Sequence, residues 1–243
     1  MRTSILLGLT LCCGFTFTQT SAQTTVSDGS IRTQIQGIDI PSVPNAPFTA
    51  KVVVTWDQPL VGGGTVSRKY FTLVARDSKG RVRRETRNFV SANSSAEPPL
   101  RSFSIADTVA ATHTTCLQST MTCTVTEFHP RISLTDESGG DLPASTGNLK
   151  RISLGEQTID ALPVRGTRET ITTVAGTHGS DRIVISHRDI WYSPDLQMDL
   201  SVVRSSPQMG QLTLTVTDLV RGEPDSSWFT IPSGYEVRNP YIR

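Results

Sequence analysis

The chain has 243 residues, of which 36% are hydrophobic and 19% are charged, and its formal net charge at pH 7 is +1. Near neutrality gives no electrostatic reason to expect nucleic acid or an anionic membrane as a partner. After the first dozen residues no apolar run approaches the roughly 20 residues that cross a bilayer, so we do not expect an integral membrane protein.

The first 22 residues are predicted to be a secretory signal peptide. Arg2 supplies the positive charge, residues 5–15 supply the apolar stretch, and Thr20-Ser21-Ala22 supplies small residues for cleavage. Cleavage after Ala22 leaves 221 residues (243 minus 22) with 22 basic and 22 acidic side chains, since only Arg2 is lost. We therefore expect an extracytoplasmic protein, periplasmic or secreted.

Two alternatives for this segment are a buried N-terminal helix and a lipoprotein signal in which Cys12 or Cys13 carries the lipid. The helix is disfavoured because Thr, Cys and Gly make a poor helix core. The lipoprotein signal is disfavoured because Leu11 precedes Cys12, where lipid attachment prefers a small residue.

Cys116 and Cys123 remain after cleavage and are predicted to form a disulfide between adjacent strands. The alternative is a pair of free thiols. A zinc site is not expected, because no third or fourth cysteine is present to complete it.

Along the chain, residues 23–48 are rich in Gly and Pro and are expected to form an extended arm, with one short strand around residues 31–40. Residues 49–243 are expected to form a single antiparallel β domain, because apolar and polar residues alternate with period two. Val52, Val54 and Trp56 share one face of its first strand. Further strands are expected at residues 66–76, 81–89, 101–107, 110–116, 122–129, 149–156 and 161–173. Asp77-Ser78-Lys79-Gly80 is predicted to be a tight turn.

The last third of the chain is expected to form a long meander with one apolar face. Its inward-facing residues are expected to be Ile183, Ile185, Trp191, Met198, Leu200, Val202, Leu212, Leu214, Val216 and Val220. Arg188 is expected on the opposite face. Beyond the meander, Asp225 is predicted to cap a short turn, and Trp228-Phe229 to close one end of the core. No segment shows three turns of helical periodicity.

No catalytic constellation is evident, and we expect neither enzymatic activity nor a cofactor nor a metal. His187 and Asp189 lie two apart on one strand, which could suit a metal or an acid–base pair, but an ion pair on the sheet surface is the simpler interpretation. Sequence signatures of serine nucleophiles, phosphate loops and dinucleotide-binding loops are absent. Gly62-Gly63-Gly64 is interpreted as a flexible turn.

The strongest local feature is a basic set with a local net charge of +6, since eight cations face only Asp77 and Glu85. Its members are Arg68, Lys69, Arg76, Lys79, Arg81, Arg83, Arg84 and Arg87. The set could contact an anionic partner such as lipid head groups. Positive charge on an edge hairpin also opposes aggregation, which is a purely structural use. Alternation points Arg81, Arg83 and Arg87 one way and Arg84 the other.

Several motifs resemble an uncharacterised family of secreted proteins from acidobacterial soil bacteria, over nearly all of the exported chain. They are Asn45-Ala46-Pro47-Phe48, the segment 75–81, the hairpin 115–123, Gly166-Thr167-Arg168-Glu169-Thr170, Trp191-Tyr192-Ser193-Pro194, and the segments 223–225 and 232–235. The resemblance implies no catalytic residue. The late meander and its Pro-Ser-Gly-Tyr end are also similar in pattern to periplasmic lipoprotein carriers and related regulatory sensors. That likeness implies a curved, incompletely closed sheet around an apolar cavity.

Together these observations predict a mainly β protein, a curved antiparallel sheet or half-barrel of roughly 9–12 strands with few short helices. We expect it to bind a lipid or other apolar ligand on the concave face. The alternatives are a structural or protein-interaction module of the cell envelope and, third, a hydrolase.

Overall fold

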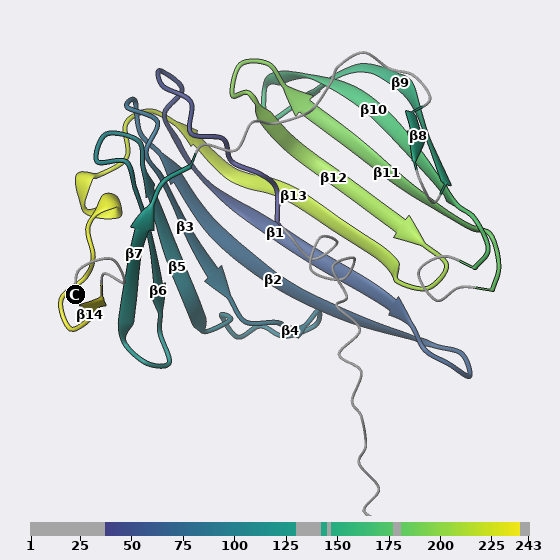
Figure 1. Cartoon of the computed structure of the whole chain (residues 1–243), viewed down its shortest axis with the longest axis horizontal. Coiled ribbons are helices and arrows are strands. Elements are labelled where there is room, and N and C mark those ends of the chain that lie inside the picture. Colours follow the sequence, from purple (N-terminus) through teal and green to yellow (C-terminus); the bar gives the residue numbers. More distant parts are fainter. Residues whose placement is uncertain (1–36, 130–141, 145–146, 177–180, 239–243) are drawn as a thin grey trace, which may run out of the picture.

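A computed structural model describes residues 37–129, 142–144, 147–176 and 181–238. These residues form one large curved antiparallel sheet that does not close on itself, and one short 3₁₀ helix (Figure 1). The predicted fold class is therefore confirmed. The signal peptide, the first part of the arm and most of the loop at 135–147 fall outside the described residues. No helix in the described part of the chain is long and apolar enough to span a membrane.

The sheet contains fourteen strands, of which β4, β8 and β14 have only two or three residues each. The first half of the chain supplies β1 (Phe48–Pro59), β2 (Thr65–Arg76), β3 (Val82–Arg87), β4 (Val90–Ser91), β5 (Leu100–Asp107), β6 (Thr112–Leu117) and β7 (Thr122–Glu127). The second half supplies β8 (Leu142–Ala144), β9 (Gly147–Ile159), β10 (Leu162–Thr173), β11 (Val184–Ser193), β12 (Met198–Ser206), β13 (Gly210–Arg221), the helix η1 (Ser226–Phe229) and β14 (Glu236–Arg238). The strands expected from periodicity are present within a few residues of their expected bounds.

The two halves are antiparallel meanders joined mainly by the long-range pairing of β1 with β13. The strand order is β14-β7-β6-β5-β3-β2-β1-β13-β12-β11-β10-β9-β8, with β4 beside β2. β1 pairs with β2 on one side and with β13 on the other, so the start and the end of the sheet domain meet at its centre. β14 adds a short parallel pairing to β7 at one edge. Neighbours elsewhere are mostly joined by short turns, as in a meander.

Alternation along the central strands produces an apolar concave face. Val52, Val54 and Trp56 of β1 point to this face, as their spacing predicts, and Val54 is fully buried. The described part of the arm crosses the same face, where Ile38 and Ile40 join the core. Residues 37–40 form no strand, so the strand expected around 31–40 is absent from its described part.

A second, smaller apolar cluster lies on the convex face of the same sheet. It contains Ala75, Phe103, Ile105, Cys116, Cys123 and Phe229. The segment around η1 covers it, and Asp225 caps the helix by accepting a hydrogen bond from the Ser227 amide. The predicted turn with an aromatic plug is confirmed. The expectation of one apolar face applies to the late meander and does not describe the whole sheet.

Two residues of the meander point opposite to expectation. Ile183 and Ile185 are 65% and 48% exposed, whereas Arg188 turns toward the buried Glu169. The reason is a register shift between Trp191 and Tyr192, which breaks the alternation on which the expectation depended. Val220 is also exposed, because the β1–β13 register shifts between Thr49 and Lys51.

The turn between β2 and β3 forms as predicted. Asp77 Oδ1 accepts hydrogen bonds from the backbone amides of Lys79 and Arg81 at 3.0 and 2.7 Å. Gly80 adopts φ +82°, and a Cβ at this position would lie 3.1 Å from the backbone of Val43. Both geometries favour the residues found there.

Candidate ligand-binding face

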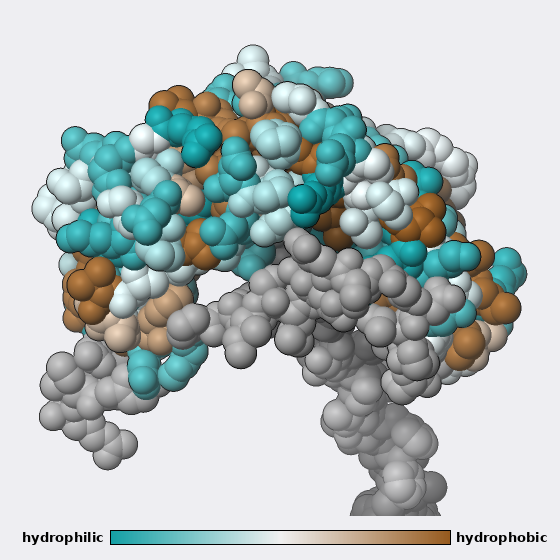
Figure 2. Space-filling model, turned by 90° about the horizontal axis from the view of Figure 1, so that it is seen from above, coloured by the Kyte–Doolittle hydropathy of each residue, from teal (hydrophilic) through white to brown (hydrophobic). Residues whose placement is uncertain are grey.

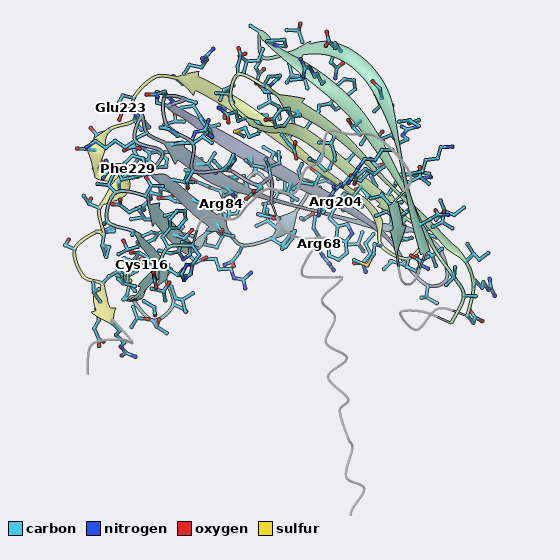
Figure 3. The ribbon with its side chains drawn as sticks, turned by 45° about the horizontal axis from the view of Figure 1, so that its top comes forward. Arg68, Arg84, Cys116, Arg204, Glu223 and Phe229 are labelled. Atoms are coloured by element: carbon cyan, nitrogen blue, oxygen red, sulfur yellow. A yellow bond between two sulfur atoms is a disulfide. The ribbon has the colours of Figure 1, made fainter. Side chains whose placement is uncertain are left out.

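The concave face is organised in transverse rows, because residues directly opposite each other on neighbouring strands point the same way. Arg68, Arg84 and Arg204 lie beneath the arch of the sheet, whereas Glu223 and Phe229 lie on its outer side (Figure 3). Seen from above, the described residues form an arch with hydrophobic and hydrophilic residues mixed over its surface (Figure 2). Two adjacent rows of the concave face form the candidate site.

The first of these, the apolar row, crosses five strands. It consists of Ile190, Val202, Leu214, Val54 and Tyr70, each opposite the next in register. Val202, Leu214, Val54 and Tyr70 are buried. The row is therefore a continuous part of the concave core from β11 to β2.

Three aromatic side chains, Trp56, Tyr70 and Phe89, lie at the β2 end of the apolar row. The Tyr70 ring meets the Phe89 ring edge to face, with centroids 4.5 Å apart, and Trp56 lies 6.4 Å from Phe89. Trp56 Nε1 donates a 2.7 Å hydrogen bond to the carbonyl of Met209, which fixes the indole. Burial raises the pKa of Tyr70, while Arg84 and Arg204 act to lower it.

The second row, the arginine row, lies two residues further along each strand. In register order it contains Arg151, Glu169, Arg188, Arg204, Leu212, Trp56 and Arg68. At its β2 end the Arg68 guanidinium lies 5.7 Å from the centre of the Trp56 ring. A charged row thus directly borders an apolar one.

Glu169 is the acidic centre of the arginine row. Its two oxygens accept from Arg151 Nε at 2.8 Å and from Arg188 Nη2 at 2.6 Å. Glu169 is 4% exposed, so this pair of contacts is largely withdrawn from water. Two guanidinium groups therefore share one carboxylate.

Electrostatic shifts mark the neighbourhood of this row. Burial lowers the pKa of Arg204, and the nearby Arg188 lowers it further. Burial raises the pKa of Asp199 to about 6, against the lowering effect of Arg188, while Asp39 contributes to the rise. Such shifts are typical of sites where charges are held in a low-dielectric setting.

A groove of about 800 Å³ lies between the arm and the β3–β7 part of the sheet. Its sheet side consists of Val82, Arg84, Ser104, Ala106, His113 and Thr126. Its other walls come from arm residues 37–43 (apart from Ile38) and from residues 127–129. Arg84 Nη2 donates to the carbonyl of Ile38 at 2.8 Å, which ties the arm across the face.

The structure does not bring the eight cations of the basic set together. Arg68 and Arg84 lie on the concave face, while Arg83 points to the convex face, where it contacts Glu85 and the carbonyls of Trp228 and Thr230. This alternation is the one expected from the sequence.

The remaining cations of the basic set are used in several ways. Arg76 is fully buried. Arg81 pairs with Asp77 at 2.6 Å, and Arg87 shares Glu85 with Arg83. Lys69 is half-buried and Lys79 is exposed. Binding of an anionic partner by the set as a whole remains a prediction.

His187 and Asp189 do not form a pair with each other, because each side chain contacts a different residue. Asp189 makes two 2.6 Å hydrogen bonds with Arg168, which lower its pKa, and His187 Nδ1 lies 3.2 Å from the Thr170 hydroxyl. Asp189 thus forms an ion pair on the sheet, although with Arg168. Among the described residues, no group of three or more His, Cys, Asp or Glu side chains is placed to hold a metal.

Cys116 and Cys123 form a disulfide, with their Cα atoms 4.0 Å apart on facing positions of β6 and β7. Both residues are fully buried beneath the C-terminal segment. The predicted pairing is present in the structure, on the face opposite the candidate site.

Sequence reasoning missed the arginine row. Its members come from seven strands, and two of them, Trp56 and Leu212, are separated by about two thirds of the chain, so no local pattern joins them. The one signal was Arg188, an arginine inside an otherwise apolar segment, and it was assigned to the outer face. Only the register of β9 to β13 shows that these side chains share a face.

Neither the family models nor the curated proteins contain a match for this chain. Solved structures do match. The crystal structure of MucB is 11% identical over 78% of this chain and 58% of that chain, with a TM-score of 0.35. LprF from Mycobacterium bovis is 15% identical over 76% and 89%, with a TM-score of 0.28. LppX from Mycobacterium tuberculosis is 14% identical over 72% and 87%, with a TM-score of 0.27.

This chain thus spans less than two thirds of the length of MucB. Because the TM-scores of these matches are below 0.5, the fold assignment depends on the strand order and register described above. The resemblance to an acidobacterial family receives no support from the comparisons and remains a prediction.

Proposed function

We propose that this protein is a non-enzymatic, extracytoplasmic binding protein that holds a lipid or another apolar ligand against the concave face of its sheet. The observation that carries the proposal is the concave face, which holds a groove of about 800 Å³ between the arm and the β3–β7 part of the sheet and the aromatic group of Trp56, Tyr70 and Phe89. Ligand sites of this kind are concave, mainly apolar and of roughly 300–1,000 Å³.

Two features support the proposed extracytoplasmic location. Residues 1–22 have the order of charge, apolar stretch and small residues that directs export, and a disulfide persists in oxidising surroundings. We propose residues 23–48 as an arm whose described part contributes one wall of the groove. The 49–243 segment is proposed as the single domain that carries the site.

The direct test is mass spectrometry of organic extracts of the protein purified from its native periplasm. We expect a lipid or other apolar compound to co-purify above the level found with an unrelated protein carrying the same purification tag. If nothing co-purifies above that control, the proposal is wrong.

A matched pair of variants locates the ligand. Phe89→Asp places a charge in the aromatic group and is expected to reduce the co-purified ligand several-fold, because burying a charge against an acyl chain is unfavourable. Val109→Asp places the same charge on a β5–β6 turn residue that is 68% exposed and is expected to retain the ligand. Equal retention by both variants would place the ligand elsewhere.

A second candidate function, a protein-interaction module of the envelope, is favoured by exposed apolar residues at the β9–β11 end of the sheet. Ile152, Ile183 and Ile185 are each more than 40% exposed. Exposed apolar groups of this kind are typical of protein contacts. Cross-linking in intact cells followed by identification of the attached protein distinguishes this candidate, and Ile185→Lys should abolish the cross-link.

A further inference from the structure

The two ends of the sheet differ in the charge of their turns. At the end where β1 stops and β2 begins, the turns β1–β2, β6–β7 and β12–β13 (residues 60–64, 118–121 and 207–209) contain no acidic or basic residue. At the opposite end each connection contains, or directly follows, an acidic residue, and these are Asp77, Asp107, Asp160, Asp195, Glu223 and Asp225. Charged side chains favour water, so only the first end can leave water at little cost.

Exposed apolar side chains gather at the same uncharged end. They include Leu60 and Val61 of the β1–β2 turn, Leu117 and Met121 beside the β6–β7 turn, and Val174 and Ile183 of the β10–β11 connection. Among the exposed large apolar side chains of the described residues, only Val109 and Val220 lie at the opposite end. Apolar residues exposed singly are normal, whereas their accumulation on one side marks a contact surface.

The β1–β2 turn is the most prominent part of this end. Val61 is 108% exposed and Leu60 is 49% exposed. The Leu60 amide donates to the carbonyl of Gly64 at 3.1 Å, which closes the turn, and a Cβ at any of Gly62–Gly64 would meet no atom within 4 Å. The turn therefore projects beyond the neighbouring strands, at the lower right of Figure 1, with two apolar side chains on it.

An aromatic and a basic residue lie directly behind the turn. Trp56 and Arg68 face each other three positions inside the pair Pro59–Thr65, which is about 10 Å along the strands. The exposed Arg68 guanidinium lies 5.7 Å from the centre of the Trp56 ring. Trp and basic side chains are typical of the boundary between a bilayer and water, and basic ones are attracted to anionic head groups. The order from the turn inward, apolar and then Trp with Arg, is the order of layers in a bilayer surface.

We propose that this end of the sheet docks on a lipid bilayer that contains anionic phospholipids. Leu60 and Val61 enter the bilayer surface, and Arg68 lies among the head groups. A bilayer is favoured over a protein because the β6–β7 and β12–β13 turns are five strand spacings apart, about 24 Å along the sheet, and a broad fluid surface contacts such separated turns without a matching shape. This inference does not rest on the proposed ligand.

The test is flotation of the exported protein with vesicles of phosphatidylcholine and phosphatidylglycerol in equal amounts. We expect the wild type to float with them. The double variant Leu60→Asp/Val61→Asp should bind about tenfold more weakly or less, because two apolar side chains no longer enter the bilayer. The matched control is Val109→Asp/Ala110→Asp, which adds the same charge to an exposed turn at the opposite end and should bind as the wild type does.

A second variant tests the role of the head groups. Arg68→Gln should weaken binding to these vesicles about fivefold, because one cation near an anionic surface contributes about 1 kcal/mol. Its binding to vesicles of phosphatidylcholine alone should equal that of the wild type. Equal binding of Arg68→Gln and wild type to both kinds of vesicle would contradict the placement of Arg68 among the head groups.

A dye that responds to polarity reports the orientation without depending on affinity. Attached at Val61→Cys, it should shift to shorter wavelength when the vesicles are added, and attached at Val109→Cys it should not. A shift at Val109→Cys alone, or equal flotation of both double variants, overturns docking by this end.

Failure of the wild type to float overturns the bilayer as partner. If Leu60→Asp/Val61→Asp then loses a cross-link to an envelope protein in intact cells, the partner is a protein. In either case the proposed ligand is unaffected, because its co-purification is measured without vesicles.

Discussion

Arg76 shows how this protein uses a buried charge to hold its parts together. It is the largest fully buried side chain among the described residues. Its guanidinium donates to the carbonyls of Ala46 at 2.9 Å, Pro41 at 3.0 Å and Leu196 at 2.7 Å. Burial lowers the pKa of Arg76 to about 10, so it stays charged near neutrality. One side chain thus ties the arm to the turn before β12.

Replacing Arg76 with Met should lower the free energy of unfolding by about 3 kcal/mol. The reason is that three carbonyls lose their donor, and each unsatisfied acceptor costs about 1 kcal/mol or more. Urea unfolding followed by circular dichroism measures this change. The matched substitution Arg165→Met, at an exposed arginine, should stay within about 0.5 kcal/mol of wild type. Equal effects of the two substitutions would contradict the tethering role.

Asp199 should make the protein less stable as the pH rises toward neutrality. Its pKa is about 6 in the folded protein against 3.8 ordinarily, so between these values the folded state holds a proton that the unfolded state has lost. Stability from this group is therefore fully present below about pH 4 and is lost as the pH passes 6. Asp199→Asn should remove this dependence.

The measurement is the difference in unfolding free energy between Asp199→Asn and wild type at pH 4, 5, 6 and 7. We expect the variant to gain on the order of 2 kcal/mol relative to wild type across this range. Taking the difference between variant and wild type cancels the contribution to stability of the carboxylates whose pKa is lowered, which have the opposite pH dependence. Asp189 and Asp225 are among them. A flat difference would show that Asp199 titrates normally.

At the scale of elements, the β6–β7 hairpin and the segment around η1 stabilise each other. Phe229 and Trp228 pack against Phe103 and against the disulfide between Cys116 and Cys123. Tyr235 adds an edge-to-face contact with Phe103 at 5.3 Å. The last residues therefore cover the end of the sheet that the disulfide fastens.

Removing the disulfide should cost about 2 kcal/mol. This estimate follows from the short loop, because the cysteines are seven positions apart and closing a loop of this size removes little entropy from the unfolded chain. The double variant Cys116→Ala/Cys123→Ala and wild type under reducing conditions should give the same denaturation midpoint. Thiol labelling of the unfolded, unreduced exported protein should find no free cysteine, and two reactive thiols would refute the bridge.

At the scale of the whole molecule, two apolar clusters lie on opposite faces of one continuous sheet. The concave cluster centres on β1, β12 and β13, and the convex cluster on β5, β6 and β7. β2 belongs to both, through Val74 on one face and Ala75 on the other. The two cores are therefore joined by backbone hydrogen bonds, without a linker between them.

This arrangement predicts that the two clusters unfold together. Leu214→Ala in the concave cluster and Phe229→Ala in the convex cluster should each lower stability by about 3 kcal/mol. In both variants hydrogen exchange should lose protection over β1–β3 and β13 to the same extent, because one cooperative unit opens. Exchange that rises only near the substituted cluster would show two independent units.

Local rules explain what was predictable. Period-two alternation in β1, β12 and the part of β13 up to Val216 depends only on neighbouring residues, and so the inward faces of these strands and the turn at Asp77–Gly80 were predicted correctly. The disulfide and the Asp225 cap also follow from short spacings. The mainly β class follows from these patterns, whereas the curved, incompletely closed sheet was implied by the likeness to periplasmic lipoprotein carriers.

Where a strand departs from regular alternation, the sequence misled. The shift between Trp191 and Tyr192 reversed the faces assigned to Ile185 and Arg188, and the shift near Ala50 exposed Val220. Such irregularities are set by the pairing of two strands and leave no reliable mark in either one. The same holds for the basic set, whose density in sequence concealed its division between two faces.

By itself, the sequence determined a β protein with one disulfide and apolar strands, because alternation and short loops are local properties, and export stays a prediction from residues 1–22. Only the tertiary structure decided that Arg151, Arg188, Arg204 and Arg68 share one row beside a row of buried apolar residues. The physical reason is register, since the side chains that meet across a sheet are chosen by pairing between strands far apart in the chain.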